Sequence, residues 1–134
     1  MSLKITKSAI DLGIVTRNPE PMVAFYRDVL GLQYTEETAM PGGGSMHRLM
    51  CGETMVKIVT PGNLSDVAAP PGGLGGASGY RYWTVSISNL DEAAATCAEA
   101  GFKLPVKPLG IRPGVRIAMV DDPDGNWVEL LEIS

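Results

Sequence analysis

The chain has 134 residues, of which 45% are hydrophobic, and it carries a formal charge of −4. This length and composition are typical of one globular domain with its own core, and no apolar run or basic cluster suggests a membrane or nucleic-acid partner. Two cysteines, Cys51 and Cys97, are too few for a disulfide scaffold. Together with the lack of a signal-peptide pattern at the start, this favours a cytoplasmic protein.

The first half of the chain, about residues 8–60, has the pattern of a β-α-β-β-β module. Asn18 precedes a helix-forming segment as a candidate N-cap, and Gly31 follows that segment as a residue that can end a helix. In chain order we expect a strand at 10–15, a helix at 19–30, an extended segment at 32–39, and a hairpin with strands at 45–51 and 55–60.

A second module of the same order is predicted over residues 80–133, after a linker at 61–79 that is rich in glycine, proline and alanine. Asn89 is the candidate N-cap of its helix and Gly101 the residue that ends it. In chain order we expect a strand at 80–88, a helix at 90–100, a short strand at 102–106, and two strands at 116–120 and 127–133 that flank a turn at 121–126.

The two modules open with similar strands, at residues 10–15 and 82–87. Because one such module would leave a sheet face uncovered, the repeat indicates two half-sheets around a shared cavity. The expected fold is therefore α+β, with two βαβββ modules that form a cup-shaped mixed sheet with helices on its outer face. We expect both modules to belong to a single domain over residues 1–134.

Two motifs carry a resemblance to a known superfamily. FYRDVLGL at residues 25–32 and DPDGNWVEL at residues 122–130 resemble motifs of the vicinal oxygen chelate superfamily, which includes glyoxalases, bleomycin resistance proteins and extradiol dioxygenases. The resemblance covers nearly the whole chain and implies the glyoxalase-like fold. It leaves function open, since this fold serves isomerases, dioxygenases, epimerases, thiol transferases and antibiotic-binding proteins.

The resemblance also implies where a metal would be bound, because metal-dependent members place one ligand on the first strand and one on the last strand of each module. In this chain those positions fall on Asp11, Lys57, Tyr82 and Glu129. Lys57 cannot bind a metal while it is protonated, and its ammonium repels a divalent cation. We therefore expect no metal cofactor; if a divalent metal does bind, Asp11 and Glu129 are its ligands.

The alternation of side chains along strands predicts a polar face that lines the cup. One interpretation is an ion-pair network in place of the metal, with Lys57 between Asp11 and Glu129. In the other, Glu129 or Asp11 removes a proton next to a carbonyl, while Lys57 or Tyr82 stabilises the enolate oxygen. The catalytic candidates are Glu129, Asp11, Lys57 and Tyr82, and the substrate-binding candidates on this face are Met55, Thr84 and Trp127.

Two further residues are candidates for substrate binding. His47, the only histidine, is expected on an inner strand, either as a second base near the cup or as a hydrogen-bonded structural residue. Arg116 lies at the start of a late strand, from which it could reach an anionic group of a substrate. The strand pattern leaves open which face Arg116 takes.

These observations favour a metal-independent isomerase, epimerase or lyase that acts on a small carbonyl compound. One alternative is a non-catalytic protein that binds an antibiotic or a metabolite. The other is a metal-dependent lyase or dioxygenase. The expected partners are a small molecule and a second copy of the chain in a homodimer, with cups formed either within one chain or across the dimer.

Overall fold

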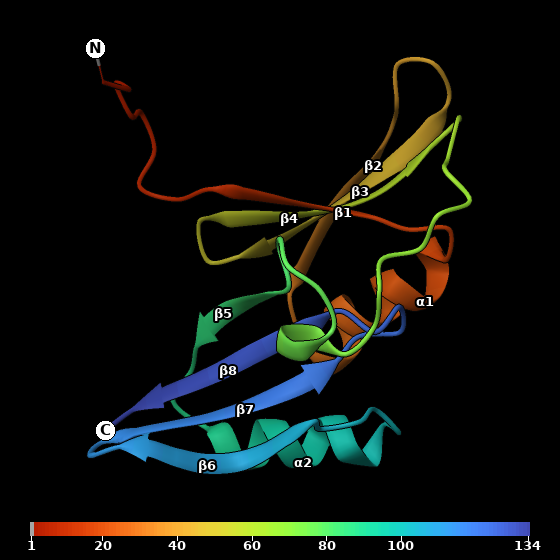
Figure 1. Ribbon diagram of the computed structural model, residues 1–134. Coiled ribbons are helices and arrows are strands. Elements are labelled where there is room, and N and C mark those ends of the chain that lie inside the picture. Colours follow the sequence, from red (N-terminus) through yellow and green to blue (C-terminus); the bar gives the residue numbers. More distant parts are fainter. Residues whose placement is uncertain (1) are drawn as a thin grey trace. The chain divides into compact units, whose positions relative to one another are not determined.

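A computed structural model gives the fold and describes residues 2–134 (Figure 1). The chain forms two compact units, which divide between Asp66 and Val67. Each unit contains one four-stranded sheet, and the two sheets have the same strand order. This confirms the predicted α+β fold of two βαβββ modules.

The sheet of the first unit has the order β1-β4-β3-β2, with β1 parallel to β4 and the other neighbours antiparallel. Its mixed character follows from the helix between β1 and β2, which carries the chain away from β1 before the antiparallel strands begin. The elements are β1 (Asp11–Val15), α1 (Pro19–Ala24), the π-helical turn η1 (Phe25–Val29), β2 (Gln33–Ala39), β3 (Gly44–Cys51) and β4 (Thr54–Pro61).

The helix predicted over 19–30 is present, but its second half is wound as a π-turn. Leu30 donates its N–H to the carbonyl of Phe25, five residues earlier, and Gly31 ends the segment with a φ of 81°. Asn18 is the N-cap residue of this helix, as predicted, although its side chain makes no capping hydrogen bond. The Asn18 N–H instead donates to the hydroxyl of Thr16 at 2.9 Å, so Thr16 shapes the entry to the helix.

Side chains on one face of the first sheet are fully buried. Leu49 on β3 and Val56 and Ile58 on β4 have no exposed surface. Lys57, which lies between Val56 and Ile58 in the chain, is partly exposed. The helical segment contributes Phe25 and Tyr26, whose rings meet edge to face with centroids 5.0 Å apart. The other face, which carries Asp11, Met55 and Lys57, is called here the site face of the first sheet.

The second unit repeats this arrangement, with the sheet order β5-β8-β7-β6 and β5 parallel to β8. The region predicted as a linker contains one short 3-10 turn. The elements are η2 (Gly73–Gly75), β5 (Tyr82–Ser86), α2 (Leu90–Glu99), β6 (Val106–Arg112), β7 (Val115–Asp121) and β8 (Trp127–Ile133).

The strand predicted at 102–106 is wrong, since β6 begins only at Val106. The preceding residues complete the end of α2, where Phe102 donates its N–H to the carbonyl of Cys97. Pro105 has no N–H to give to a ladder. Pairing therefore starts at Val106, which lies opposite Met119.

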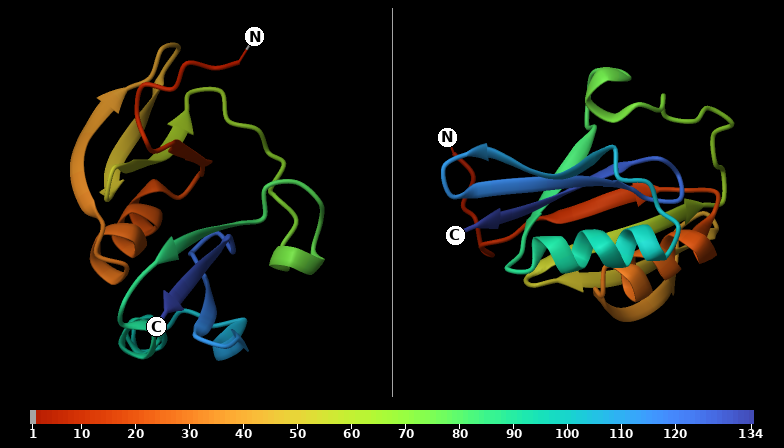
Figure 2. Two further views of the ribbon diagram at one scale, coloured as in Figure 1. Left: turned by 90° about the vertical axis from the view of Figure 1, so that its left-hand side faces the viewer. Right: turned by 90° about the horizontal axis from the view of Figure 1, so that it is seen from below.

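Helix α2 runs along one face of the second sheet (Figure 2). Its buried residues Leu90, Ala94 and Cys97 belong to the same core as Ala118 and Leu130 of the sheet. Asn89 is the N-cap residue of this helix, as predicted, although its side chain makes no capping hydrogen bond. The Leu90 N–H instead donates to the Glu132 carboxylate of β8 at 2.9 Å, so the sheet itself supplies the cap.

The turn between β7 and β8 is held by the buried carboxylate of Asp122. Its Oδ1 accepts hydrogen bonds of 2.9 Å from the N–H groups of Asp124 and Asn126. Gly125 follows with a φ of 84°, which favours glycine. This turn fixes the register of β8 against β7 and therefore the neighbours of Trp127 and Glu129.

Candidate functional site

The face of the second sheet opposite to α2 carries two rows of side chains and is called here the site face of the second sheet. In antiparallel and parallel pairing alike, residues in register point to the same face. The first row consists of Tyr82, Trp127 and Asp121, and the second row consists of Thr84, Glu129 and Met119.

Glu129 lies at the centre of this face and is half-buried. The hydroxyl of its partner Thr84 donates a hydrogen bond of 2.6 Å to Oε1 of Glu129. No cationic side chain of the described part of the second unit forms an ion pair with Glu129. Its carboxylate is therefore held in place but not neutralised, as a general base requires.

Tyr82 and Trp127 lie in register in the row next to Glu129, and Tyr82 is 47% exposed. The segment that contains η2 passes over Trp127 so closely that a Cβ on Gly73 would overlap the indole ring. Arg81 holds this segment by donating to the carbonyls of Gly73 at 2.7 Å and Pro70 at 2.6 Å. The backbone at Gly73 therefore covers part of the Trp127 ring.

Asp121 belongs to the same face and was not singled out from the sequence. It ends β7 opposite Trp127, and the alternation along β7 was the signal that could have found it. Burial raises the pKa of Asp121, while Lys103 and the indole of Trp127 oppose that shift. The face therefore contains a second carboxyl group in an environment that disfavours its charge.

The site face of the first sheet contains an ion pair. Nζ of Lys57 lies 3.3 Å from Oδ2 of Asp11, and Nζ of Lys7 lies 2.7 Å from Oδ1. Hydrogen bonds from Lys7 and then from Lys57 lower the pKa of Asp11. Met55 lies in register with Asp11 on the same face.

The residues at the superfamily's ligand positions do not fit a metal ion. In the first unit the two positions hold a carboxylate and an ammonium that already pair with each other, and an ammonium has no lone pair for a metal. In the second unit they hold Tyr82 and Glu129. Within residues 2–134 no group of three or more His, Cys, Asp or Glu side chains could hold a metal ion.

His47 does not share the site face. It is in register with Ile58 on β4, whereas Lys57 is in register with Arg48, so His47 and Lys57 point to opposite faces. Its Nδ1 lies 2.8 Å from the hydroxyl of Tyr34. His47 is thus the hydrogen-bonded structural residue of the two alternatives left open by the sequence.

Arg116 also points to the helix side of its sheet. Its guanidinium donates two hydrogen bonds, of 3.1 and 2.7 Å, to the carboxylate of Asp91 on α2, and it lies 3.6 Å from Glu132. The register thus settles the face of Arg116, which the strand pattern left open. Its role is to tie β7 to the start of α2.

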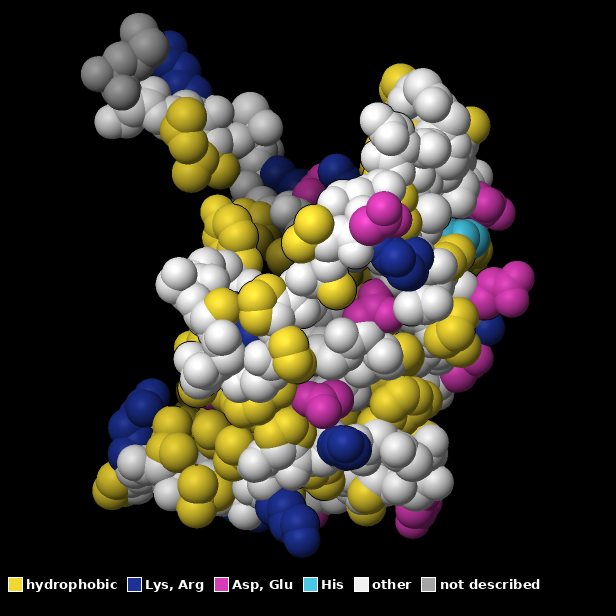
Figure 3. Space-filling model, turned by 45° about the vertical axis from the view of Figure 1, so that its right-hand side comes forward, with side chains coloured by type: hydrophobic (Ala, Val, Ile, Leu, Met, Phe, Trp, Pro, Cys, Tyr) yellow, Lys and Arg dark blue, Asp and Glu magenta, His cyan; other side chains and the backbone are white. Residues whose placement is uncertain are grey.

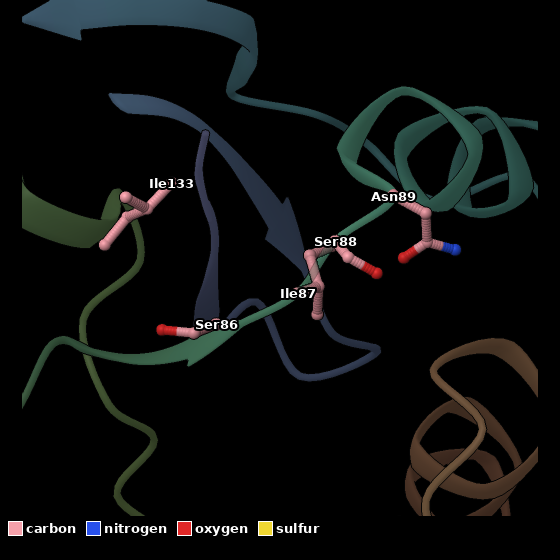
Figure 4. A pocket seen from close by; sticks show the side chains of 5 residues that line it. All are labelled: Ser86, Ile87, Ser88, Asn89 and Ile133. Carbon is pink, nitrogen blue, oxygen red and sulfur yellow. The ribbon is translucent and has the colours of Figure 1, made fainter. Parts of the chain in front are cut away.

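An open pocket of about 520 Å³ lies where β5 leads into α2. Figure 4 shows the side chains of Ser86, Ser88 and Asn89 along this segment and Ile133 nearby. None of the lining residues is ionisable. Ser86 follows Thr84 along β5 on the site face, so the pocket lies at one end of that face.

The surface has no dominant charge on the side drawn in Figure 3, where acidic and basic side chains are interspersed. No helix in residues 2–134 combines the length and the apolar character needed to cross a membrane.

Comparisons with known proteins agree with this fold. The model of the Glyoxalase/Bleomycin resistance protein/Dioxygenase superfamily matches residues 9–130. The chain therefore belongs to this superfamily, as its two motifs indicate. None of the curated proteins compared with the chain matches it.

Several solved structures are similar in fold. A glyoxalase family protein from Bacillus cereus has a TM-score of 0.78 and 16% identity, covering 99% of both chains. TioX from Micromonospora sp. ML1 has a TM-score of 0.72 and 19% identity, covering 96% of this chain and 100% of that one. A glyoxalase/bleomycin resistance protein from Streptomyces sp. CB03234 has a TM-score of 0.67 and 19% identity, covering 92% and 98%. At these identities the likeness concerns the fold alone.

Proposed function

We propose that this protein is a metal-independent isomerase, epimerase or lyase that moves a proton next to the carbonyl group of a small molecule. The observation that carries the proposal is the Glu129 carboxylate, which a 2.6 Å hydrogen bond from Thr84 holds on the site face without neutralising it. Enolisation requires a base that removes the proton from carbon and a hydrogen-bond donor that stabilises the enolate oxygen.

Glu129 is a better base than Asp11, although both occupy ligand positions of the superfamily. Asp11 contacts two ammonium groups, and these lower its pKa and its tendency to accept a proton. Its ion pair with Lys57 is proposed to occupy the first unit's ligand positions in place of a metal. We propose metal independence because the ammonium of Lys57 supplies a fixed positive charge at these positions.

Tyr82 is the proposed donor to the enolate oxygen, since its row is adjacent to that of Glu129 and its ring is exposed. Turnover that is lost in Tyr82→Phe supports this role, and unchanged turnover contradicts it.

Deuterium exchange tests the reaction. The protein is incubated in D2O with dihydroxyacetone, pyruvate or oxaloacetate, and loss of the carbon-bound proton is followed by proton NMR. We expect Glu129→Gln to slow exchange by about 10² to 10⁴-fold, the usual contribution of a general base. Glu99→Gln, an exposed change on α2, is the matched control and is expected to have no effect. Equal exchange in Glu129→Gln and the wild type, or none in the wild type, would contradict the proposal.

The second candidate function is binding without turnover. The pairing of Tyr82 with Trp127 favours it, because neighbouring aromatic rings can stack on a planar ligand. A ligand that quenches the indole fluorescence and no longer binds to Trp127→Phe would support this candidate over the enzyme, provided that the protons of the ligand do not exchange.

We also propose that the protein forms a homodimer, as two-fold symmetric dimers are the commonest oligomers. Light scattering on the purified chain tests this directly. A mass of twice 14.2 kDa supports the proposal, and the mass of one chain contradicts it.

A further inference from the structure

Asp121 lies on the site face of the second sheet but has no role in the fold or in the reaction proposed for Glu129. It lies in register with Trp127, while Met119, two residues before it, lies in register with Glu129. Asp121 and Glu129 are therefore diagonal neighbours on adjacent strands, which places their Cα atoms about 7–8 Å apart.

The carboxyl group of Asp121 is incompletely satisfied. Its Oδ1 is buried and accepts no hydrogen bond within the described chain. The side chains that act on the pKa of Asp121 are the ammonium of Lys103 and the indole of Trp127. Glu129 lies in the next row on the adjacent strand, and Tyr82 lies in the same row two strands away. A buried oxygen without a donor costs free energy, and such groups in native proteins are found at functional sites.

The two carboxyl groups differ in their surroundings. Glu129 is half-buried and accepts a hydrogen bond from Thr84. At Asp121 burial outweighs the opposing effects of Lys103 and Trp127 and raises the pKa. A carboxyl group whose surroundings favour its protonated form is suited to act as an acid beside a carboxylate that acts as a base.

We propose that Asp121 is a second catalytic residue, the acid that protonates the substrate oxygen while Glu129 removes the proton from carbon. This role for Asp121 rests on the proposed function and adds a proton donor to the same reaction. The C–H electron pair forms the C=C bond of an enol, the carbonyl π pair takes the proton of Asp121, and Glu129 holds the proton from carbon. Return of a proton from Glu129 to carbon, and of the hydroxyl proton to Asp121, completes the cycle without an outside reagent.

The first test needs no substrate. Carbon-13 NMR of the labelled carboxyl groups of the whole chain follows the titration of Asp121. We expect its midpoint to lie above the ordinary aspartate value, and to rise further in Lys103→Met because that change removes a group that favours the charge. A midpoint at or below the ordinary value would overturn the inference and leave the role of Glu129 untouched.

The second test uses exchange into dihydroxyacetone, pyruvate or oxaloacetate, whichever the wild type exchanges fastest. Asp121→Asn is expected to lower kcat by about 10²-fold or more, with KM within about twofold, and to remove the basic limb of the pH–rate profile. Asp121→Glu, which restores an acid, is expected to recover part of the rate and that limb. A normal kcat and profile in Asp121→Asn would overturn the inference, whereas loss of exchange in the wild type would overturn the proposed function itself.

Discussion

The hydroxyl of Thr84 donates a 2.6 Å hydrogen bond to Oε1 of Glu129 across the parallel pair β5–β8. This contact fixes the carboxylate that we propose as the base. Thr84→Val keeps the shape of the side chain but removes the donor, and we expect it to lower kcat for exchange by about tenfold, the equivalent of one hydrogen bond. Thr84→Ser keeps the donor and is expected to retain most of the rate. Equal rates in the two variants would show that the hydrogen bond has no part in the reaction.

The two lysines around Asp11 predict a graded titration. Lys7 is the larger cause of the lowered pKa and Lys57 the smaller, so Lys7→Met should raise the Asp11 midpoint more than Lys57→Met. Because the folded pKa lies below the unfolded one, this group stabilises the fold at pH above its unfolded pKa, and the contribution is lost as the pH falls through the folded pKa.

Carbon-13 NMR titration of the Asp11 carboxyl measures both effects, with Lys4→Met as the control because Lys4 is exposed and makes no ion pair with Asp11. If the titration midpoint of Asp11 is the same in both lysine variants as in the wild type, the two contacts do not persist in solution.

The start of α2 should depend on β8 rather than on its own N-cap. Glu132→Ala leaves the Leu90 N–H without its acceptor, and we expect a loss of about 1 to 2 kcal/mol in the free energy of unfolding, as for other lost caps. Asn89→Ala removes a side chain that does not cap the helix, so its cost should be smaller. Urea unfolding compares the two, and a larger loss in Asn89→Ala would contradict the assignment.

Asp121 should reduce stability at neutral pH. Its folded pKa is raised, so ionisation penalises the folded state as the pH rises from the unfolded pKa through the folded one. Asp121→Asn is therefore expected to increase Tm at pH 7 and to leave it unchanged at pH 2.5, where both states are protonated. Thermal unfolding at the two pH values measures this, and a decrease in Tm at pH 7 would contradict the account.

The architecture could be predicted from the sequence because the signals were local. Alternating strands, stop glycines and the two motifs placed nearly every element, and β8 (Trp127–Ile133) begins and ends where expected. Asn18 and Asn89 are the N-cap residues of their helices, as predicted, but neither side chain makes a capping hydrogen bond. At α2 the Leu90 N–H donates to Glu132 instead, and this contact joins residues 42 positions apart, which no local pattern shows.

The site was predictable only in part. Alternation gave the shared face of Thr84 and Glu129, because both lie on regular strands in register. It did not give the faces of His47 and Arg116, which depend on the pairing partners of β3 and β7. Asp121 was assigned to the turn rather than to β7, so the alternation along β7 was not extended to it.

Metal independence is the central claim, and the rate of the chelator-treated protein tests it most directly. The chain is dialysed against EDTA, its metal content is measured by mass spectrometry, and deuterium exchange is then followed with and without added Zn²⁺, Ni²⁺, Fe²⁺ or Mg²⁺. The account predicts an unchanged rate in the metal-free protein, still abolished by Glu129→Gln and not raised by any of the ions. A rate that disappears with the metal and returns when one ion is added back would contradict it.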